Sequence, residues 1–360
     1  MSRLSRITSL SAAPLNAAMN EPFAIAGGVE TEIRNVLVRV RLADGTVGWG
    51  EGAPMSAFNG ETQAGVLRGA RRMRDTLVGR DTAGWRALLE QLEERLPECG
   101  AARAAVGMAV LDAWTRHVRI PLRALFGGAE SRVRSDVTVA IVPPGQARAA
   151  ARSIWARGIR TIKIKVGSDL DEDEARVRAV HDAGSGLRLM LDANQGYGPS
   201  AALSLLRRLK AKGIKPVLFE QPVAAADLAG LRGVSRHGGV PVAADESASG
   251  REAVLRLARA RAVQVVNIKL MKCGLLEAWD MAAIARAAGL GLMIGGMIES
   301  HLAMGAAAHF AAGLGGFDFV DLDTPLWFAR DPMAGMRMRR NGVYDLSPVR
   351  RGIGVRPLSS

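Results

Sequence analysis

Eight short runs of β-branched and apolar residues recur in the later part of this chain, and their spacing constrains the fold more than any other feature. Each run is followed by an amphipathic stretch rich in Ala and Arg, so the pattern predicts successive βα units. Polar residues near the ends of the runs, from Lys165 to Asp321, repeat every 24 to 28 positions, with Gly295 marking the seventh turn. This period favours a parallel barrel over a doubly wound sheet, because no G-x-G-x-x-G motif follows the first run. The runs are Asp136–Val142, Thr161–Val166, Leu187–Asp192, Val217–Glu220, Val240–Asp245, Val263–Lys269, Leu290–Ile294 and Phe317–Asp321.

The residues before this period predict a smaller domain of mixed structure. Asn35–Leu42 and Thr46–Glu51 are strand-like runs, and the Asp-Gly pair between them is typical of a hairpin. A helical pattern follows over 61–125. We therefore predict an α/β protein in three parts: an α+β capping domain (1–125), a (β/α)7β TIM-like barrel that carries the active site (126–325), and a C-terminal segment that packs back on the capping domain (326–360).

Composition argues against several classes of protein. No apolar run reaches the roughly 18 residues that a membrane span requires, so we expect no membrane association. The net charge is +13, but the arginines are scattered without interleaved aromatic residues, and we expect no nucleic-acid partner. Cys99 and Cys273 are far apart and lack metal-type spacing, which fits a cytoplasmic protein without disulfides. Arg3 and Arg6, without nearby acids, faintly resemble a transit peptide, but an opening strand is the favoured interpretation.

Three acidic residues end three consecutive predicted strands: Asp192, Glu220 and Asp245. In a parallel barrel these strand ends converge on one mouth. A single acid there would more often be a surface or helix-capping residue, but three together would repel one another unless a cation lay between them. Oxygen ligands suit Mg²⁺. We therefore predict one Mg²⁺ per active site, with Mn²⁺ as a substitute.

Three lysines lie within predicted strands on either side of these acids. Lys163 and Lys165 alternate with Ile162 and Ile164, so both lysines should point into the barrel mouth, and Lys269 should enter from the far side. A lysine inside a strand is costly unless it is paired or functional, and partial burial near a cation suits it to act as a base. The alternative is that the lysines only neutralise the acids as structural ion pairs.

These residues resemble a known family. The two lysines of the second strand, the three acids and the Lys269–Gly274 segment are similar to the muconate-lactonizing subgroup of the enolase superfamily. The Val47–Glu51 hairpin and the Gly295–Ser300 turn extend the resemblance over nearly the whole chain. Relatives of the mandelate-racemase type place a histidine base after the seventh strand, whereas this chain has glycines there and offers Lys269 on the sixth.

The eighth strand refines the resemblance, because Asp321-Leu322-Asp323 is similar to the D-x-D motif of dipeptide epimerases. In those enzymes the terminal carboxylate of the substrate binds the metal and its α-ammonium group meets the two acids. The resemblance implies that Lys165 and Lys269 exchange the α-proton from opposite faces, and that Lys163 and Mg²⁺ stabilise the enediolate.

Other reactions use the same metal and lysines and stay open at this stage. They are those of an L-Ala-D/L-Glu epimerase proper, a muconate-type cycloisomerase, an o-succinylbenzoate synthase-like dehydratase and an N-acylamino acid racemase. A catalytically silent binding or structural homologue is the alternative outside enzymes, since a fold alone does not establish function.

The substrate's side chain should be set by the capping loops, where we place Phe23 and Ile25, with Phe58 beside them. We also expect Met297 and Ser300, in the turn after the seventh strand, to contact the substrate. In the glutamate-specific epimerases that this chain resembles, an arginine in the first capping loop binds the glutamate carboxylate. The matching stretch here, residues 23–28, carries no cation. We therefore expect a dipeptide with a small or apolar C-terminal residue, unless Arg34 or another arginine reaches in. We also expect a homo-oligomer.

Overall fold

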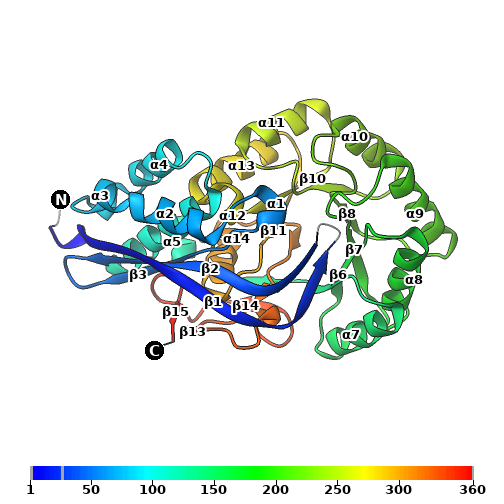
Figure 1. Ribbon diagram of the computed structural model, residues 1–360, viewed down its shortest axis with the longest axis horizontal. Helices are drawn as coiled ribbons and strands as arrows, with labels where there is room; N and C mark the ends of the chain where they lie inside the picture. The colour runs from blue at the N-terminus through cyan, green and yellow to red at the C-terminus, as the bar shows by residue number, and fades with distance from the viewer. Residues whose placement is uncertain (1–2, 26–27, 359–360) are drawn as a thin grey trace.

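A parallel sheet of eight strands forms the centre of the molecule (Figure 1). The computed structural model describes residues 3–25 and 28–358. The strands follow one another around the sheet in chain order, and the Asp136 N–H donates to the Val320 carbonyl at 2.9 Å, which joins the two ends of the sheet. The strands are β5 (Val137–Val139), β6 (Thr161–Lys165), β7 (Arg188–Asp192), β8 (Leu218–Glu220), β9 (Val242–Ala244), β10 (Val265–Lys269), β11 (Gly291–Gly295) and β12 (Phe319–Val320).

Every connection between these strands contains a helix, so the predicted (β/α)7β barrel is confirmed. The helices bury one apolar face each; α7, for example, buries Ala147, Ala151 and Ile154, which lie one turn apart. Capping side chains mark where helices begin. For example, the side chain of Asp169 accepts hydrogen bonds from N–H groups in the first turn of α8. The helices are α7 (Pro144–Ala156), α8 (Leu170–His181), α9 (Pro199–Ala211), α10 (Leu228–His237), α11 (Arg251–Ala260), α12 (Leu270–Cys273), α13 (Leu275–Ala287) and α14 (His301–Leu314).

One end of the barrel interior is plugged by apolar side chains. Met190, Leu218, Ala243, Val265 and Met293 point inward from successive strands and form a buried cluster. Each of these residues lies at or before the middle of its strand, so the plug fills the end where the strands begin. The polar side chains of the strand ends are therefore left to the opposite mouth.

The capping domain contains a three-stranded antiparallel sheet of β1 (Ile7–Ile25), β2 (Gly28–Leu42) and β3 (Val47–Gly52). The predicted hairpin is present, with Arg41 paired to Val47. The predicted opening strand is also present and is the longest strand described. The helices of this domain are η1 (Arg3–Ser5), α1 (Ser56–Asn59), α2 (Gln63–Arg72), α3 (Arg74–Leu77), η2 (Thr82–Gly84), α4 (Trp85–Arg95), α5 (Gly100–His117) and α6 (Leu122–Leu125).

Glycines in β3 allow helix α5 to pack directly on the strand. A Cβ atom at Gly48 would lie 2.2 Å from the Ala109 carbonyl, and one at Gly50 would lie 2.0 Å from the Ala105 carbonyl. No other residue could be accommodated without separating strand and helix. This close packing fixes Glu51, which follows directly, at the boundary with the barrel.

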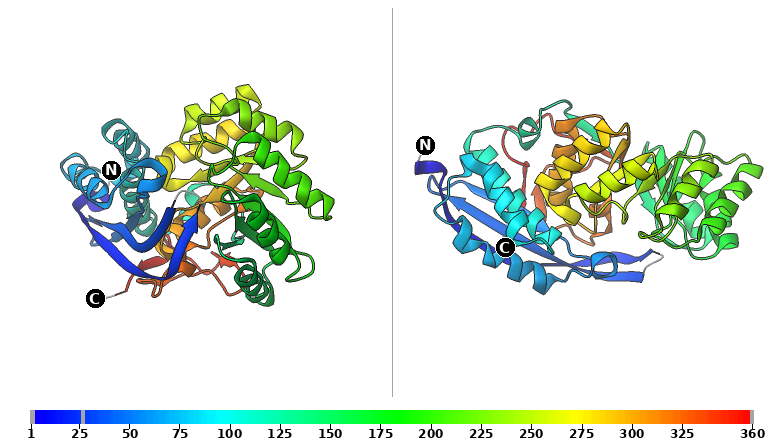
Figure 2. Two further views of the ribbon diagram at one scale, coloured as in Figure 1. Left: turned by 45° about the vertical axis from the view of Figure 1, so that its right-hand side comes forward. Right: turned by 90° about the horizontal axis from the view of Figure 1, so that it is seen from above.

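The C-terminal segment lies against both the barrel and the capping domain. It contains η3 (Thr324–Trp327), β13 (Met333–Gly335), β14 (Val343–Asp345) and β15 (Val355–Pro357). Strand β14 pairs with β4 (Arg132–Arg134), and Phe328 forms an isolated bridge with Met19 of β1. In Figure 2 the β1–β2 hairpin extends from the capping domain toward the barrel, and the α8–α10 side lies at the far end.

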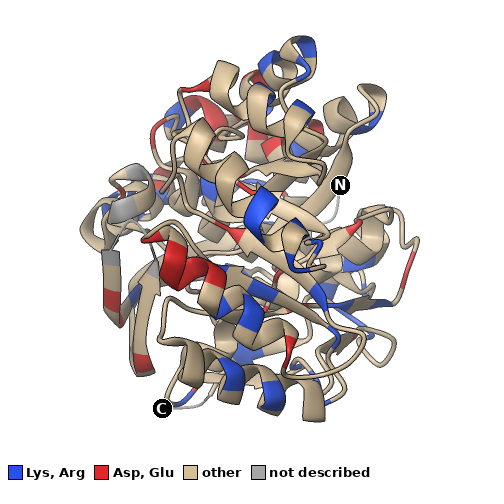
Figure 3. Ribbon diagram, turned by 90° about the vertical axis from the view of Figure 1, so that its right-hand side faces the viewer, with Lys and Arg blue, Asp and Glu red and all other residues tan. Residues whose placement is uncertain are grey.

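The charged residues and the two cysteines are distributed as the sequence predicted. On the face in Figure 3, basic residues are spread over several elements and interspersed with acids. Both cysteines are free thiols, but only Cys273 is buried, whereas Cys99 is half-buried. No helix within residues 3–25 and 28–358 has the length and apolar character needed to cross a bilayer.

Candidate active site

Strand β6 presents two lysines to the barrel mouth. Lys163 and Lys165 are 1% and 7% exposed, respectively, while the alternate residues Ile162 and Ile164 pack in the hydrophobic core. The alternation of a strand therefore separates the charged and apolar sides, as the sequence predicted.

Lys163 lies at the centre of the acidic groups. Its Nζ is 2.9 Å from Asp192 Oδ2, 2.8 Å from Glu220 Oε2 and 2.7 Å from Asp321 Oδ2. All three carboxylates are buried. These contacts with acids raise the pKa of Lys163 well above its usual value, against the opposing and largest effect of burial.

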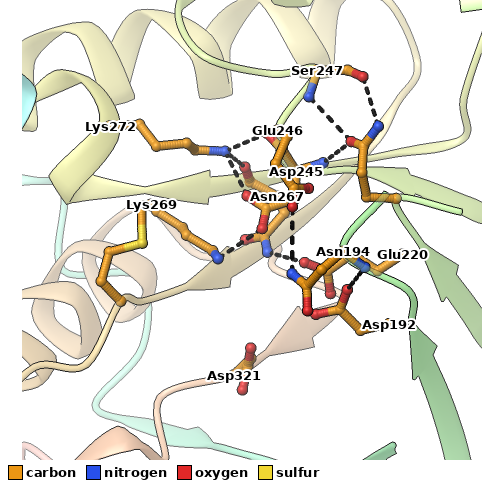
Figure 4. A network of polar contacts seen from close by, with 12 residues as sticks. Asp192, Asn194, Glu220, Asp245, Glu246, Ser247, Asn267, Lys269, Lys272 and Asp321 are labelled. Carbon is orange, nitrogen blue, oxygen red and sulfur yellow. Dashed lines mark hydrogen bonds and ion pairs between the residues drawn. The ribbon is translucent and has the colours of Figure 1, made fainter. Parts of the chain in front are cut away.

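The other two lysines enter from opposite sides of the mouth. Lys165 Nζ is 2.7 Å from Asp192 Oδ2 and 2.8 Å from Asn194 Oδ1. Lys269, at the end of β10, places its Nζ 2.7 Å from Asp245 Oδ2 (Figure 4). Three strands separate β10 from β6 in the sheet, so the two side chains approach the same space from different directions.

Two further polar residues support the acids and were not singled out from the sequence. Asn267 donates from Nδ2 to Glu220 Oε1 at 2.7 Å. Lys272 Nζ contacts Asp245 Oδ1 at 3.0 Å, on the other side of that carboxylate from Lys269. A usable signal existed for Asn267, because it stands two residues before Lys269 on the same strand face.

The charge balance at the mouth favours an added cation. Five buried acids lie at the mouth against four buried lysines, so the carboxylates are in excess when all are ionised. Burial and repulsion from Asp192 raise the pKa of Glu220 to about 7, although Lys163 opposes the rise. Burial would also raise the pKa of Asp245, but Lys269 and Lys272 outweigh it and hold it at about 2. The groups counted are Asp192, Glu220, Asp245, Asp321, Asp323, Lys163, Lys165, Lys269 and Lys272.

The three predicted metal ligands fit Mg²⁺ by donor chemistry but are not already grouped as a cage. In the described part of the chain, no three His, Cys, Asp or Glu side chains stand in a metal-holding group. Lysines explain this, because Lys163 Nζ contacts two of the carboxylates. Glu220 Oε2 and Asp245 Oδ2 lie within 2.8 Å of a lysine Nζ yet lack hydrogen-bond geometry, so lone pairs remain for a hard cation.

The two acids after β12 occupy the same mouth but have different environments. Asp321 accepts from Lys163, whereas Asp323 Oδ2 accepts the Thr138 N–H at 2.6 Å. Burial, together with repulsion from Asp321, raises the pKa of Asp323 to about 7. Both residues line the cavity at the mouth.

A narrow cavity connects these groups. Its volume is about 60 Å³, which is room for only a few water molecules, so a larger ligand can enter only if the lining moves. A larger cavity, of about 980 Å³, lies elsewhere, between α4 and the α11–α13 region, and contains none of the predicted site residues. We assign the active site to the small cavity because the lysines and acids converge there. Its lining includes Phe23, Met55, Phe58, Thr138, Asn194, Glu246, Met297, Ile298 and Thr324.

Of the predicted substrate contacts, Ser300 is not brought to this cavity, and Ile25 cannot be placed against it. Ser300 is buried and does not line it; its hydroxyl hydrogen-bonds Glu51 and accepts the Leu302 N–H as the N-cap of α14. Its predicted contact with substrate therefore does not match its position. The side chain of Ile25 lies outside the described residues.

Family comparisons cover both halves of the chain. Residues 8–127 match the model for the mandelate racemase / muconate lactonizing enzyme N-terminal domain, and residues 146–359 match the enolase C-terminal domain-like model. The chain belongs to the mandelate racemase / muconate lactonizing enzyme family. The resemblance seen in the sequence is therefore confirmed.

Similar proteins within this family share nearly their full length with the chain. It is 47% identical over 350 residues to an aromatic dipeptide epimerase of Herpetosiphon aurantiacus, covering 97% of this chain and 98% of the relative. It is 37% identical to an L-Ala-D/L-Glu epimerase of Thermotoga maritima, with coverage of 92% and 96%. The Enterococcus faecalis dipeptide epimerase, solved in complex with Mg and the dipeptide L-Leu-L-Tyr, superposes with a TM-score of 0.93 at 32% identity, covering 97% of this chain and 99% of that one.

Proposed function

We propose that the chain is a Mg²⁺-dependent dipeptide epimerase, an isomerase that inverts the α-carbon next to the substrate's C-terminal carboxylate. The observation that carries this proposal is the approach of Lys165 and Lys269 to one cavity from strands on different sides of the barrel. A carbon held between them can lose a proton to one lysine and gain one from the other. The name of the Herpetosiphon aurantiacus relative supports this reaction class.

Each lysine has a distinct role in this scheme. One of Lys165 and Lys269, as a free amine, accepts the α-proton, and the electron pair left on the carbon spreads onto the substrate's carboxylate oxygens. Lys163 lies deeper between the acids and donates hydrogen bonds to those oxygens as their negative charge grows. The other lysine, as an ammonium, then returns a proton to the opposite face, and the two exchange roles for the other epimer.

Asp192, Glu220 and Asp245 would hold the Mg²⁺. When bound, the ion supplies positive charge that makes the α-proton of a coordinated carboxylate substrate more acidic. The Mg present in the Enterococcus faecalis complex supports this choice of metal, and we propose one ion per site, with Mn²⁺ as a substitute. The same three acids contact the lysines in this structure, so each carboxylate could exchange a contact with a lysine ammonium group for one with the metal ion.

The substrate's free ammonium group would bind Asp321 and Asp323. Both acids line the cavity, and Asp321 has one buried oxygen, Oδ1, with no hydrogen-bond partner among the described residues. A charged ammonium group supplies donors for such an oxygen. A dipeptide would thus span from the three metal ligands to this pair of acids.

The substrate's C-terminal side chain would be apolar. The cavity is lined by Phe23, Phe58, Met297 and Ile298, and its described lining includes no arginine. Its only cations are the lysines assigned to catalysis, each of which already contacts a carboxylate. The aromatic-dipeptide and Leu-Tyr relatives support an apolar residue over glutamate.

Isotope exchange tests the proposal. In D₂O with Mg²⁺, the protein should epimerise L-Ala-L-Phe and place deuterium at the C-terminal α-carbon. Lys165→Ala and Lys269→Ala should each stop epimerisation, and each should leave exchange from only one epimer, with opposite preferences. If either variant still interconverted the epimers at the parent rate, the two-lysine assignment would be wrong.

Three further features belong to the same proposal. The chain would divide into the capping domain (1–125), the barrel (126–325) and the C-terminal segment (326–360), a division that the β4–β14 pairing and the Met19–Phe328 bridge support by linking the last part to both others. We also propose that the protein acts in the cytoplasm on free dipeptides and assembles as a homo-oligomer.

A further inference from the structure

Two phenylalanines of the capping domain each lie against a different lysine of the cavity. Lys165 Nζ is 5.8 Å from the centre of the Phe23 ring, and Lys269 Nζ is 5.3 Å from the centre of the Phe58 ring. Both rings line the cavity together with both lysines. The two contacts are separate, because each ring approaches one ammonium group only.

The rings are supported by different parts of the structure. Phe23 lies near the end of β1, is buried, and meets the indole of Trp327 edge-on with a centroid distance of 4.6 Å. Phe58 lies on the short helix α1 and is only half-buried. The ring of Phe23 is therefore anchored by the C-terminal segment, whereas the ring of Phe58 is on a short helix and is more exposed.

A ring in this position restrains a flexible side chain. Lysine has four rotatable side-chain bonds, and an aromatic face within about 6 Å attracts its ammonium group while excluding water from that side. Each ammonium group also contacts a carboxylate, Asp192 for Lys165 and Asp245 for Lys269. Ring and carboxylate together leave each Nζ few other positions.

We propose that Phe23 and Phe58 are positioning residues, each of which aims one lysine at one face of the substrate's α-carbon. The inference rests on the proposed two-lysine epimerisation and adds that the capping domain controls the two faces separately. Phe23 serves the face of Lys165, and Phe58 serves the face of Lys269. The rings do not take part in proton transfer themselves.

The test combines each ring change with each lysine change. In Lys165→Ala only Lys269 remains to exchange the α-proton, and in Lys269→Ala only Lys165 remains. Phe23→Leu and Phe58→Leu are added to each background, and deuterium uptake by L-Ala-L-Phe and L-Ala-D-Phe is measured at saturating substrate, so that loss of binding is separated from loss of rate. Thermal melting verifies that every variant is folded.

We expect each phenylalanine change to reduce the exchange rate most where the lysine that the ring contacts is the one that remains. In the Lys165→Ala background, Phe58→Leu should reduce the saturating exchange rate roughly fivefold to tenfold more than Phe23→Leu does, and the order should reverse in the Lys269→Ala background. Phe58→Tyr, which keeps an aromatic face at a half-buried position, should recover most of the loss caused by Phe58→Leu. If Phe23→Leu does not fold, the Phe58 variants in the two backgrounds decide alone.

The possible failures are distinct. Equal losses in both backgrounds, or a change confined to KM, would overturn the positioning role while leaving the two-lysine scheme intact. Absence of exchange from either epimer in both lysine variants, with folded protein, would overturn the two-lysine scheme and the inference with it.

Discussion

The ammonium group of Lys272 binds both the side-chain carboxylate and the main-chain carbonyl of Asp245. Nζ lies 3.0 Å from Oδ1 and 2.8 Å from the Asp245 carbonyl oxygen, and it also contacts the Asn267 carbonyl at 2.7 Å (Figure 4). Three acceptors thus share one buried cation. Because Lys269 contacts the other carboxylate oxygen, Asp245 is fixed between two lysines.

Removing this cation should destabilise the fold. Lys272→Met leaves two carbonyl groups and one carboxylate oxygen without their buried partner, so we expect a loss of about 3 kcal/mol in the free energy of unfolding. Lys212→Met is a matched control, because Lys212 is exposed and its ion pair with Glu174 is 3.4 Å long; its effect should stay within about 0.5 kcal/mol. Urea denaturation measures both. Equal stability of the two variants would show that Lys272 is dispensable for the fold.

Metal binding should be visible without catalysis. Mg²⁺ that binds only the folded chain stabilises it by about 2.7 kcal/mol at 100 times its dissociation constant, so Tm should rise by several degrees when Mg²⁺ is added after treatment with EDTA. The same treatment should abolish and then restore epimerisation.

The control for the metal prediction is Asp245→Ala, which removes one predicted ligand. Its Tm should respond little to Mg²⁺, and it should lack activity. Full activity of Asp245→Ala in metal-free buffer would contradict the assignment of the metal site.

His309 is held neutral inside helix α14. Its Nδ1 accepts the Arg123 N–H at 3.0 Å, so its Nε2 carries the proton and donates to the Ile353 carbonyl at 3.1 Å. Burial is the largest cause that lowers the pKa of His309, to about 3. A protonated ring would also lose the bond from Arg123, since both of its nitrogens would be donors.

This histidine should make the fold less stable in acid. The folded pKa is below the unfolded value of about 6.5, so the unfolded chain binds the extra proton first. Above pH 6.5 the histidine has no effect on stability. As the pH is lowered from 6.5 to 3, the free energy of unfolding falls by about 1.4 kcal/mol per pH unit. His309→Gln, whose amide can both accept and donate, should lose this part of the slope, whereas His237→Gln at an exposed position should keep it. Urea denaturation at several pH values would refute the prediction if both variants had the same slope.

The sequence was sufficient for the barrel and for the three lysines and the acids that meet at its mouth. Strand periodicity sets the inward side of β6, and parallel strands bring their ends to one edge, so Lys163 and Asp192 could be placed together without coordinates. Strand boundaries were less well predicted: the expected run Asp136–Val142 is only Val137–Val139 in the structure. The ends of such short strands are set by the loops that follow them, which periodicity does not describe.

Contacts between the two domains could not be predicted from local patterns. Glu51 is buried and accepts from Asn35 Nδ2 at 2.7 Å and from the Ser300 N–H at 3.0 Å, across 249 positions of sequence in the latter case. Sequence alone placed Ser300 near the substrate because it follows the seventh strand. The structure instead joins it to the capping domain, and only the packing of β3 on α5 brings Glu51 within reach.

The last prediction concerns the substrate's side chain. We expect kcat/KM for L-Ala-L-Phe to exceed that for L-Ala-L-Glu by about 100-fold or more, because an extra carboxylate in this cavity would be buried without a free cation, at a cost of several kcal/mol. Phe23, Phe58 and Met297 instead offer apolar contact. Introducing a cation should reverse the order: Met297→Arg is expected to lower kcat/KM for L-Ala-L-Phe and raise it for L-Ala-L-Glu, and Met297→Leu controls for the loss of methionine. Steady-state kinetics on both dipeptides provide the measurement. A parent protein that prefers L-Ala-L-Glu would refute the apolar assignment, because it would mean that a cation such as Arg34 reaches the cavity when substrate binds.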